Sequence, residues 1–384
     1  MAYWEVGKLE AFCVPWLPEK WELGLLKAIP GLGKEAERLS RRRFEPLAAA
    51  PKVQGRLGEW GRLIRRKMGG GEELSYEAND WLMKTMAKEC SRSGVKAVHS
   101  YEDCSLWQFQ AAKKRGKACI YDMPIGYYGW WQRKEEELAK KYRDWLPSGG
   151  LSSSRWVRPE QKKKEMELAD VVVTACTFAA NTIREFFDKD VRLAPYGVDL
   201  PEAVADRKKK DGVFRVVYAG TASVRKGVPL LLEVWKKLGW KDAELVLAGS
   251  WQLVRPMENH LPPGVRHAGP LAHGTLMKLF QEADWLILPS NFEGYGLVIL
   301  EALAHGLPIL ASTATGAADL PKSEAVRLFE PENPEQLAGA MIAAKATRGE
   351  DLSGEARKIA AGCSWENYRE AVTEAVRPLL DWPP

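Results

Sequence analysis

Apolar strand-like runs alternate with amphipathic helical segments through the second half of the chain, and this alternation constrains the fold more than any other feature. Runs rich in β-branched and apolar residues predict strands at residues 214–220, 243–250, 264–270, 284–290 and 307–312. Helical spacing predicts helices at residues 226–239, 271–283 and 296–305. Strands that alternate with helices of about 10 to 15 residues indicate βαβ units and a parallel sheet.

The first half of the chain shows a similar but less regular pattern. Strand-like runs lie at residues 95–102, 117–124, 170–176 and 190–197, and helical segments at 105–116 and 177–188. The polar stretch 201–212 carries a run of charges and predicts a linker between domains. For a chain of 384 residues, we therefore predict an α/β protein with two Rossmann-like domains, at residues 1–200 and 201–364.

Residues 291–312, NFEGYGLVILEALAHGLPILAS, contain the strongest candidate for a functional site. Glu293 and the Gly-Tyr-Gly that follows it lie between a predicted strand and a helix that carries Glu301. Small residues at the start of a helix let backbone N–H groups approach an anion. The Glu301 carboxylate could accept hydrogen bonds from both hydroxyls of a ribose. Alternatively, Glu293 is an ordinary loop carboxylate and Glu301 a charge on the helix surface.

This segment resembles the donor-site signature of retaining GT-B glycosyltransferases, particularly those of glycosyltransferase family 4. The resemblance extends from about Phe214 to Ser312 and continues more loosely upstream through residues 169–178 and 194–200. It implies the GT-B architecture, in which two Rossmann-like domains face each other across a cleft. It also implies that the last helix, in residues 365–384, packs back on the N-terminal, acceptor-side domain.

The resemblance implies roles for individual residues. Glu293 corresponds to the Glu that touches the donor sugar, and Glu301 to the Glu that binds the ribose. Lys226 corresponds to the Lys that binds the donor diphosphate, and the neighbouring Arg225 can add positive charge for the leaving group. The other donor-binding positions follow the predicted strands or begin the helix: Gly220, Thr221, Gly249, Gly269, Leu271, Gly294, Tyr295, Gly296 and Leu297.

Two positions depart from the family pattern. Members often carry an Arg five residues before the diphosphate-binding Lys, where this chain has Thr221, and Arg225 is the candidate substitute. Members also often carry a His after the strand that matches residues 117–124, where this chain has Asp122. Asp122 is therefore a catalytic candidate that could accept a hydrogen bond from a sugar hydroxyl, or it could simply cap the turn before Pro124.

The beginning of the chain also differs from the family pattern. Members usually open with a strand and a Gly-rich loop that faces the cleft. This chain begins with what resembles the following helix, at residues 2–9, and a strand at residues 11–17. We therefore expect the first strand of the N-terminal domain to be missing, which leaves open whether the acceptor side is active.

Three further residues are candidates for the acceptor side. His99 ends a predicted strand and could face the cleft, or it could be a structural histidine. Tyr127 and Tyr128 begin the aromatic run YYGWW (127–131). That run could stack on a sugar, lie at a membrane interface or pack in the core.

Positive charge is concentrated in the first 200 residues, which hold 35 Lys and Arg against 28 Asp and Glu, whereas the remainder holds 21 against 23. Basic clusters lie beside apolar or aromatic residues in GRLIRRKM (61–68) and YYGWWQRK (127–134). Such stretches could bind an anionic membrane surface or form a solvated basic face. Nucleic acid would not explain the donor signature, so we predict none as a partner.

The sequence predicts neither secretion nor a membrane span. No apolar run reaches the ~20 residues that a spanning helix needs, and the first residues lack the basic start and apolar stretch of a signal peptide. The six cysteines show no CxxC or zinc-like spacing, which fits a reducing compartment. We expect a cytoplasmic protein, peripheral on the inner face of the membrane if its basic clusters bind lipid.

The predicted function is transfer of a hexosyl group, with retention, from a UDP- or GDP-linked sugar to an alcohol acceptor. The acceptor is a glycan, a lipid-linked sugar or a small molecule. No acidic pair is placed to hold a divalent ion, so we predict metal independence, with the nucleotide sugar as co-substrate and no other cofactor. The alternatives are a sugar-nucleotide epimerase with the same fold and a catalytically impaired scaffold or binding protein.

Overall fold

The computed structural model describes residues 1–42, 47, 49–67, 72–147, 158–202, 212–348 and 350–380, and the side chains of residues 62–79 lie outside this description. The chain divides into two compact units. Unit 1 comprises Met1–Asp122, Trp156–Val172 and Val372–Pro384, and unit 2 comprises Met123–Arg155 and Val173–Ala371. Parts of the first 200 residues therefore belong to unit 2. Compact units and functional domains need not coincide, so the predicted domain bounds remain a prediction.

Unit 2 contains a six-stranded parallel sheet in the order β12-β11-β10-β7-β8-β9. Its first strand, β7, lies in the middle; β8 and β9 extend the sheet on one side, and β10, β11 and β12 on the other. This is the doubly wound order of a Rossmann-like domain. The five strands predicted in this half are confirmed, and β12 was not predicted. The strands are β7 (Phe214–Ala219), β8 (Ala243–Ala248), β9 (Val265–Gly269), β10 (Trp285–Leu288), β11 (Ile309–Ser312) and β12 (Val326–Phe329).

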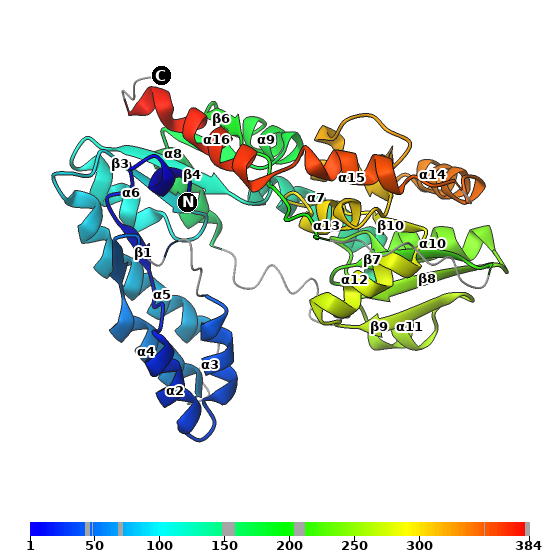
Figure 1. Cartoon of the computed structure of the whole chain (residues 1–384), viewed down its shortest axis with the longest axis horizontal. Helices are drawn as coiled ribbons and strands as arrows, with labels where there is room; N and C mark the ends of the chain where they lie inside the picture. The colour runs from blue at the N-terminus through cyan, green and yellow to red at the C-terminus, as the bar shows by residue number, and fades with distance from the viewer. Residues whose placement is uncertain are drawn as a thin grey trace. The chain divides into compact units, whose positions relative to one another are not determined.

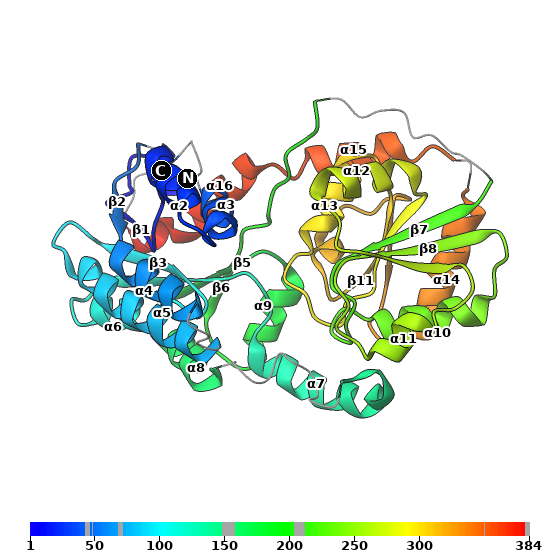
Figure 2. The ribbon, with the colours of Figure 1, turned by 90° about the horizontal axis from the view of Figure 1, so that it is seen from below.

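Helices lie on both faces of this sheet. Helices α12, α13 and α15 cover one face, and α10 and α14 cover the other (Figure 2). Because both faces are covered, the central strands are almost continuously apolar, and β10 and β11 are buried along their whole length. The helices are α10 (Val228–Leu238), α11 (Arg255–Asn259), α12 (His273–Glu282), α13 (Leu297–Ala304), α14 (Pro334–Ala346) and α15 (Ser353–Ala361).

Local sequence sets the bounds of α10. Gly227 at its N-cap and Gly239 at its C-cap both have left-handed backbone conformations, with φ of 69° and 60°. Pro229 lies in the first turn, where its missing N–H costs no hydrogen bond. Gly239 therefore ends the helix at the position that the sequence predicted.

Helix α7 (Tyr128–Lys141) and the 3-10 turn η3 (Arg143–Trp145) come from the first half of the sequence but contribute to the core of unit 2. Trp131, Leu138 and Tyr142 are buried in the same apolar cluster as the strands from β7 to β11. The backbone N–H of Val254 donates to the carbonyl of Trp145 at 3.0 Å. This part of the first half is therefore folded against the Rossmann-like sheet.

A second, four-stranded sheet contains the strands that were predicted in the first half, in the order β3-β4-β5-β6. In the parallel pair of β3 and β4, Ala97 lies beside Ala118 and Tyr101 beside Asp122. The four predictions are confirmed. The strands are β3 (Ala97–Tyr101), β4 (Ala118–Met123), β5 (Val171–Thr174) and β6 (Asp190–Leu193), with α9 (Thr177–Arg184) between the last two.

Unit 1 contains β3 and most of β4 and is otherwise mainly helical. A short parallel pair joins β1 (Phe12–Val14) to β2 (Lys52–Gln54). Figure 1 shows α2 and α3 at the end of unit 1 that is farthest from β3 and β4. The helices are α1 (Ala2–Glu5), α2 (Lys20–Ala28), α3 (Gly33–Ser40), α4 (Arg56–Lys67), α5 (Glu72–Ala87), the 3-10 turn η2 (Lys88–Ser91), α6 (Leu106–Lys113) and α8 (Pro159–Leu168), and the C-terminal α16 (Trp365–Val376) ends in this unit.

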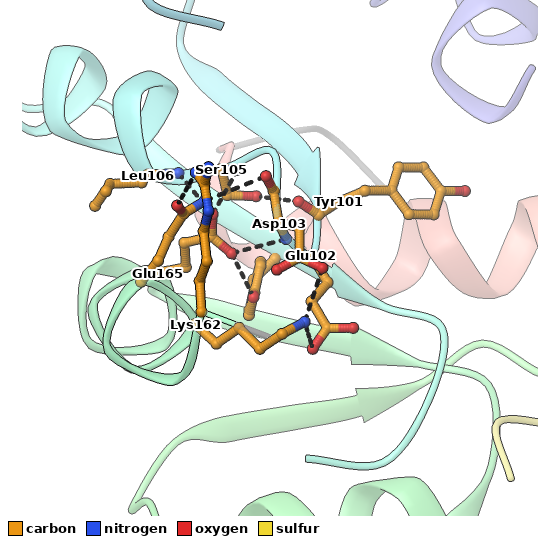
Figure 3. A network of polar contacts seen from close by, with 10 residues as sticks. Tyr101, Glu102, Asp103, Ser105, Leu106, Lys162 and Glu165 are labelled. Carbon is orange, nitrogen blue, oxygen red and sulfur yellow. Dashed lines mark hydrogen bonds and ion pairs between the residues drawn. The ribbon is translucent and has the colours of Figure 1, made fainter. Parts of the chain in front are cut away.

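A buried carboxylate, Glu165 on α8, holds the start of α6 in unit 1 (Figure 3). One oxygen accepts from the backbone N–H groups of Ser105 and Leu106, at 3.0 and 3.1 Å. The other accepts from the Asp103 N–H at 3.0 Å and the Tyr121 hydroxyl at 2.7 Å. A carboxylate at a helix N-terminus is stabilised by the helix dipole. With these donors in place, Glu165 is a framework residue rather than a binding group.

Candidate functional site

The candidate site lies where the strand order of unit 2 reverses. Strands β7 and β10 are neighbours in the sheet, with Val216 beside Trp285, but they are far apart in the sequence. Ligands of doubly wound sheets bind at the carboxyl ends of the strands beside such a reversal. The loop after β7 carries Arg225 and Lys226, and the loop after β10 carries Glu293. The sheet therefore brings together the residues that the sequence singled out.

Lys226 and Glu293 form an ion pair between these two loops. The Lys226 side chain is 14% exposed and the Glu293 side chain 12%. Burial, with a smaller contribution from the neighbouring Arg225, lowers the pKa of Lys226 to about 7, and contact with the Glu293 carboxylate opposes this shift. The other Glu293 oxygen accepts from the Gly294 N–H at 3.1 Å. Below the pKa of Lys226, the pair is thus a cation and an anion held together with little access to water.

Arg225 lies beside this pair and is itself largely buried. Its guanidinium donates to the carbonyl of Phe292 at 3.3 Å, and its backbone carbonyl accepts from the Asn291 N–H at 2.8 Å. Burial lowers the pKa of Arg225, although an arginine stays protonated at neutral pH. Two cationic side chains therefore lie between the ends of β7 and β10.

Asn291 and Glu332 connect the two loops, and the sequence analysis identified neither. The Asn291 side-chain amide donates to the carbonyl of Val224 at 3.0 Å and to Glu332 at 2.7 Å. Glu332 also accepts from Lys141 and Tyr142, both at 2.7 Å. Its φ is +58°, which is unfavourable for a residue with a Cβ. These hydrogen bonds hold the Glu293 loop against the Lys226 loop and against the end of α7.

Glycines allow the strand ends to approach one another closely. A Cβ at Gly227 would lie 1.8 Å from the carbonyl oxygen of Pro289, and a Cβ at Gly249 would lie 1.9 Å from that of Gly220. The Gly249 N–H donates to the Gly269 carbonyl at 2.9 Å. The predicted donor-binding glycines Gly220, Gly249 and Gly269 therefore lie at the carboxyl ends of three adjacent strands. The remaining predicted positions here are Thr221, bonded to Ser250 at 3.0 Å, and Leu271, which is partly buried against the core.

The Gly-Tyr-Gly segment leads from Glu293 into α13. A Cβ at Gly294 would lie 2.0 Å from the carbonyl oxygen of Pro124, and the Cys176 thiol donates to the Gly294 carbonyl at 2.8 Å. Tyr295 is buried, which raises the pKa of its hydroxyl. Gly296 is the N-cap of α13, with φ of 80°, and Leu297 at the first position is exposed. The start of α13 is thus fixed from several sides.

Glu301 lies in the second turn of α13, with its side chain 33% exposed. A carboxylate oxygen lies 3.9 Å from Nε2 of His273, which is exposed at the start of α12. At that distance the contact is a weak one. Glu301 is therefore available to a ligand, as a ribose-binding residue would have to be.

Asp122 and His99 were predicted as two separate candidates, and in unit 1 they form a hydrogen bond with each other. Nε2 of His99 lies 3.2 Å from the Asp122 carboxylate, and Nδ1 lies 2.5 Å from the hydroxyl of Tyr3 on α1. Asp122 is buried. Burial, and then the charge of Asp122, raises the pKa of Tyr3. The catalytic role of Asp122 and the acceptor-side role of His99 stay predictions.

The aromatic run 127–131 packs mainly against other aromatic side chains of unit 2. Tyr127 is buried and contacts Phe186 and Phe187. Trp130 and Trp131 pack on Phe292, and their ring centroids lie 5.8 and 5.3 Å, respectively, from the centroid of the Phe292 ring. Of the three interpretations that the sequence left open, core packing describes these rings. Tyr128 is half-buried, and the acceptor-side role of both tyrosines stays a prediction.

Within the described ranges, no group of three His, Cys, Asp or Glu side chains is placed to hold a metal ion. Metal independence itself stays a prediction. All six cysteines are free thiols, and none of the helices in the described part of the chain is long and apolar enough to cross a membrane. The side chains of the basic cluster 61–68 lie largely outside the described residues.

Comparison with known proteins agrees with this geometry. Residues 213–345 match the family model described as glycosyl transferases group 1. This part of unit 2 is similar to the group 1 glycosyl transferases. It contains Lys226, Glu293 and Glu301, and it ends beyond β12. The resemblance predicted from the sequence is therefore confirmed.

Relatives and solved structures extend the similarity of the glycosyltransferase domain. The chain is 32% identical to an uncharacterized glycosyltransferase of Methanocaldococcus jannaschii, over 34% of this chain and 35% of that protein. It is 27% identical to a D-inositol 3-phosphate glycosyltransferase of Paenarthrobacter aurescens, over 58% of this chain and 64% of that protein. These matches span less than two thirds of either relative. Sucrose-phosphate synthase from Thermosynechococcus elongatus aligns with a TM-score of 0.57 at 19% identity, over 80% of this chain and 79% of that one, and its likeness confirms the GT-B fold.

Proposed function

We propose that this protein transfers a glycosyl group from a nucleoside diphosphate sugar to an alcohol acceptor. The observation that carries the proposal is the buried Lys226–Glu293 pair at the reversal of strand order. A nucleotide sugar presents an anionic diphosphate next to a sugar rich in hydroxyl groups. A cation and a hydrogen-bond acceptor side by side match these two parts of one ligand.

In this proposal the domain stabilises the leaving group. Negative charge grows on the diphosphate as the bond to the sugar breaks, and Lys226 and Arg225 supply positive charge in a site with little water. The N-terminus of α13 adds the positive end of a helix dipole. Glu293 accepts from a sugar hydroxyl, and Glu301 holds the ribose. In more detail, we propose that the transferred group is a hexosyl group, that its anomeric configuration is retained and that the donor is UDP- or GDP-linked. We also propose that the reaction needs no metal ion and that the protein is cytoplasmic.

Nucleotide binding is the first test. UDP, GDP and ADP are added separately to the full chain, and thermal unfolding is followed. A nucleotide at 100 times its dissociation constant should add about 2.7 kcal/mol to the free energy of unfolding. If no nucleoside diphosphate shifts the unfolding transition, the donor-site proposal is wrong.

Donor turnover then separates the alternatives. The sugar nucleotide of the preferred base is incubated with the protein, and the products are resolved by chromatography. Release of free nucleoside diphosphate supports a transferase, since water replaces the acceptor slowly in the absence of an alcohol. An intact nucleotide that carries an altered sugar indicates an epimerase. A nucleotide that binds and stays unchanged, with or without a panel of alcohols, indicates a binding protein.

A further inference from the structure

Helix α2 of unit 1 presents a row of large apolar side chains to solvent. Trp21 is 65% exposed, Leu25 60% and Ile29, directly after the helix, 42%. Their spacing of four residues places them on one face, because an α-helix has 3.6 residues per turn. Gly24 and Ala28, also exposed, extend this face on one side of the row. We call this face the α2 stripe.

The stripe is not the face by which α2 is held in the fold. Leu23 and Leu26 on the opposite side are buried, and they pack in one cluster with Ala36 and Leu39 of α3. A surface helix of a globular protein ordinarily has one apolar face, which packs on the core. Helix α2 has two apolar faces, and the second one faces solvent.

Other exposed apolar side chains in the described part of the chain are dispersed. Among the described side chains, Leu57 on α4, Trp81 on α5 and Ile342 on α14 each come from a different helix. Isolated residues of this kind are ordinary on protein surfaces. Three at helical spacing, one of them a tryptophan, need a different explanation.

Lysines flank the stripe. Lys20 and Lys27 are exposed on α2, about 40° and 60° around the helix from Gly24 at one edge of the stripe, and Lys34 is exposed at the start of α3. None of the three forms an ion pair with another described residue. The exposed Glu19 at the N-cap accepts from the backbone of the first turn. Three exposed lysines against one exposed carboxylate leave a net positive charge beside the stripe.

We infer that the α2 stripe is a docking surface for an anionic lipid bilayer. Trp21, Leu25 and Ile29 would enter the boundary between headgroups and acyl chains, and the lysines would contact lipid phosphates. Tryptophan prefers that boundary because its ring is apolar and its N–H is polar. The sequence had pointed to residues 61–68 and 127–134 for this role, but the rings of the second stretch are largely packed inside unit 2.

A second copy of the chain fits the stripe less well. A helix of nine residues is about 13 Å long, and a row about 10 Å wide covers roughly 130 Å². A stable protein interface buries about 800 Å² on each partner. A bilayer needs no such area, since a few inserted side chains and nearby cations suffice for reversible binding. The inference does not depend on the proposed transfer reaction, because lipid binding is measured without a donor.

Vesicle co-sedimentation of the full chain tests the inference. Wild-type protein is mixed with vesicles of phosphatidylcholine alone, or of phosphatidylcholine with phosphatidylglycerol. Binding is expected only to the anionic vesicles, with loss as salt rises. The double variant Trp21→Ser, Leu25→Ser should bind at least tenfold more weakly. Lys20→Gln and Lys27→Gln should each weaken binding about fivefold, which corresponds to about 1 kcal/mol per cation.

Ile342→Ser is the matched control, because it removes an equally exposed apolar side chain from a helix of unit 2. It should bind like wild type. All variants change exposed residues, and their unfolding temperatures should match wild type. Equal binding by wild type and the α2 double variant, or no binding to anionic vesicles at low salt, overturns the inference. Sedimentation velocity tests whether a second copy of the chain binds the stripe instead. If wild type is a dimer and the double variant is a monomer, the stripe is a self-association surface and the inference is overturned.

Discussion

The ammonium of Lys226 lies against the carboxylate of Glu293, although the two residues follow different strands and are separated by the whole of β8 and β9 in the sequence. When Lys226 is protonated and no ligand is bound, each group therefore neutralises the other. A diphosphate that binds Lys226 has to replace Glu293 as its partner. Glu293 then becomes available to a sugar hydroxyl, so that one ligand occupies both groups.

Replacement of Lys226 by alanine should lower turnover about 100-fold, which is the usual cost of losing one electrostatic contact to a transition state. Steady-state kinetics with the preferred donor measures this. Lys237→Ala is the control, because Lys237 is exposed in the last turn of α10, well away from the strand ends. An equal loss of turnover in both variants would show that Lys226 is not part of the donor site.

Nucleotide binding should take up a proton above neutral pH. Burial lowers the pKa of Lys226 to about 7, so near pH 8 the free protein carries it mostly neutral. A bound diphosphate favours the charged ammonium and raises that pKa. Affinity should therefore fall as pH rises above 7, and little proton should be taken up near pH 6, where Lys226 is already charged.

Calorimetric titration with UDP or GDP in buffers of different ionisation enthalpy measures this proton uptake. Near pH 8 the phosphates are fully ionised, since their last pKa is about 6. Lys226→Ala should abolish the uptake. An apparent binding enthalpy that does not depend on the buffer near pH 8 would contradict the prediction.

Glu332→Ala should lower the free energy of unfolding by about 2 to 3 kcal/mol. The variant loses hydrogen bonds to Asn291, Lys141 and Tyr142, each worth about 1 kcal/mol. Urea denaturation measures the change. Glu324→Ala is the control, because Glu324 is exposed and its ion pair with Arg327 lies on the surface. A Glu332 variant as stable as this control would show that the network contributes nothing.

Gly227→Ala should destabilise unit 2 more than Gly239→Ala. Both glycines have positive φ, so each alanine meets a similar backbone strain of about 1 kcal/mol. The difference is space: the added Cβ at Gly227 would lie 1.8 Å from the Pro289 carbonyl oxygen, whereas nothing lies within 4 Å at Gly239. Thermal unfolding of the two variants compares them directly. The same loss in both would mean that the loops at β7 and β10 separate easily.

Turnover should survive EDTA, because Lys226 and Arg225 supply the positive charge that a divalent ion would otherwise give the leaving group. The measurement compares initial rates with chelator, and with magnesium or manganese added back. Loss of activity that either ion restores would falsify this part of the proposal.

Local patterns predicted the strands of the sheet and the residues at their ends. Gly239 marks the end of α10, and the strand–EGYG–helix segment marks the start of α13, because turn and helix-start chemistry is visible in a few neighbouring residues. Lys226 and Glu293 were both identified from the resemblance, but their direct contact required the order of the strands. That order depends on packing between distant segments.

Local sequence patterns could not predict the hydrogen-bond network of Asn291 and Glu332. Glu332 lies in a polar stretch before α14, where the sequence indicates only a turn and an Asn-Pro helix start. Its partners come from α7 and from the end of β10, and no spacing rule connects three such segments. In the same way, the bond between His99 and Asp122 joins neighbouring strands, and its third member, Tyr3, comes from a helix near the start of the chain.

The backbone of Glu332 has consequences for comparing this chain with its relatives. With φ at +58°, this position suits glycine better than any other residue. A relative with glycine there gains an unstrained turn but leaves the hydroxyl at position 142 without this acceptor, whereas the amide at position 291 keeps the carbonyl at position 224. Positions 142 and 332 should therefore vary together among homologues, with an apolar residue at 142 wherever 332 is glycine, and this covariation can be sought in any large collection of related sequences.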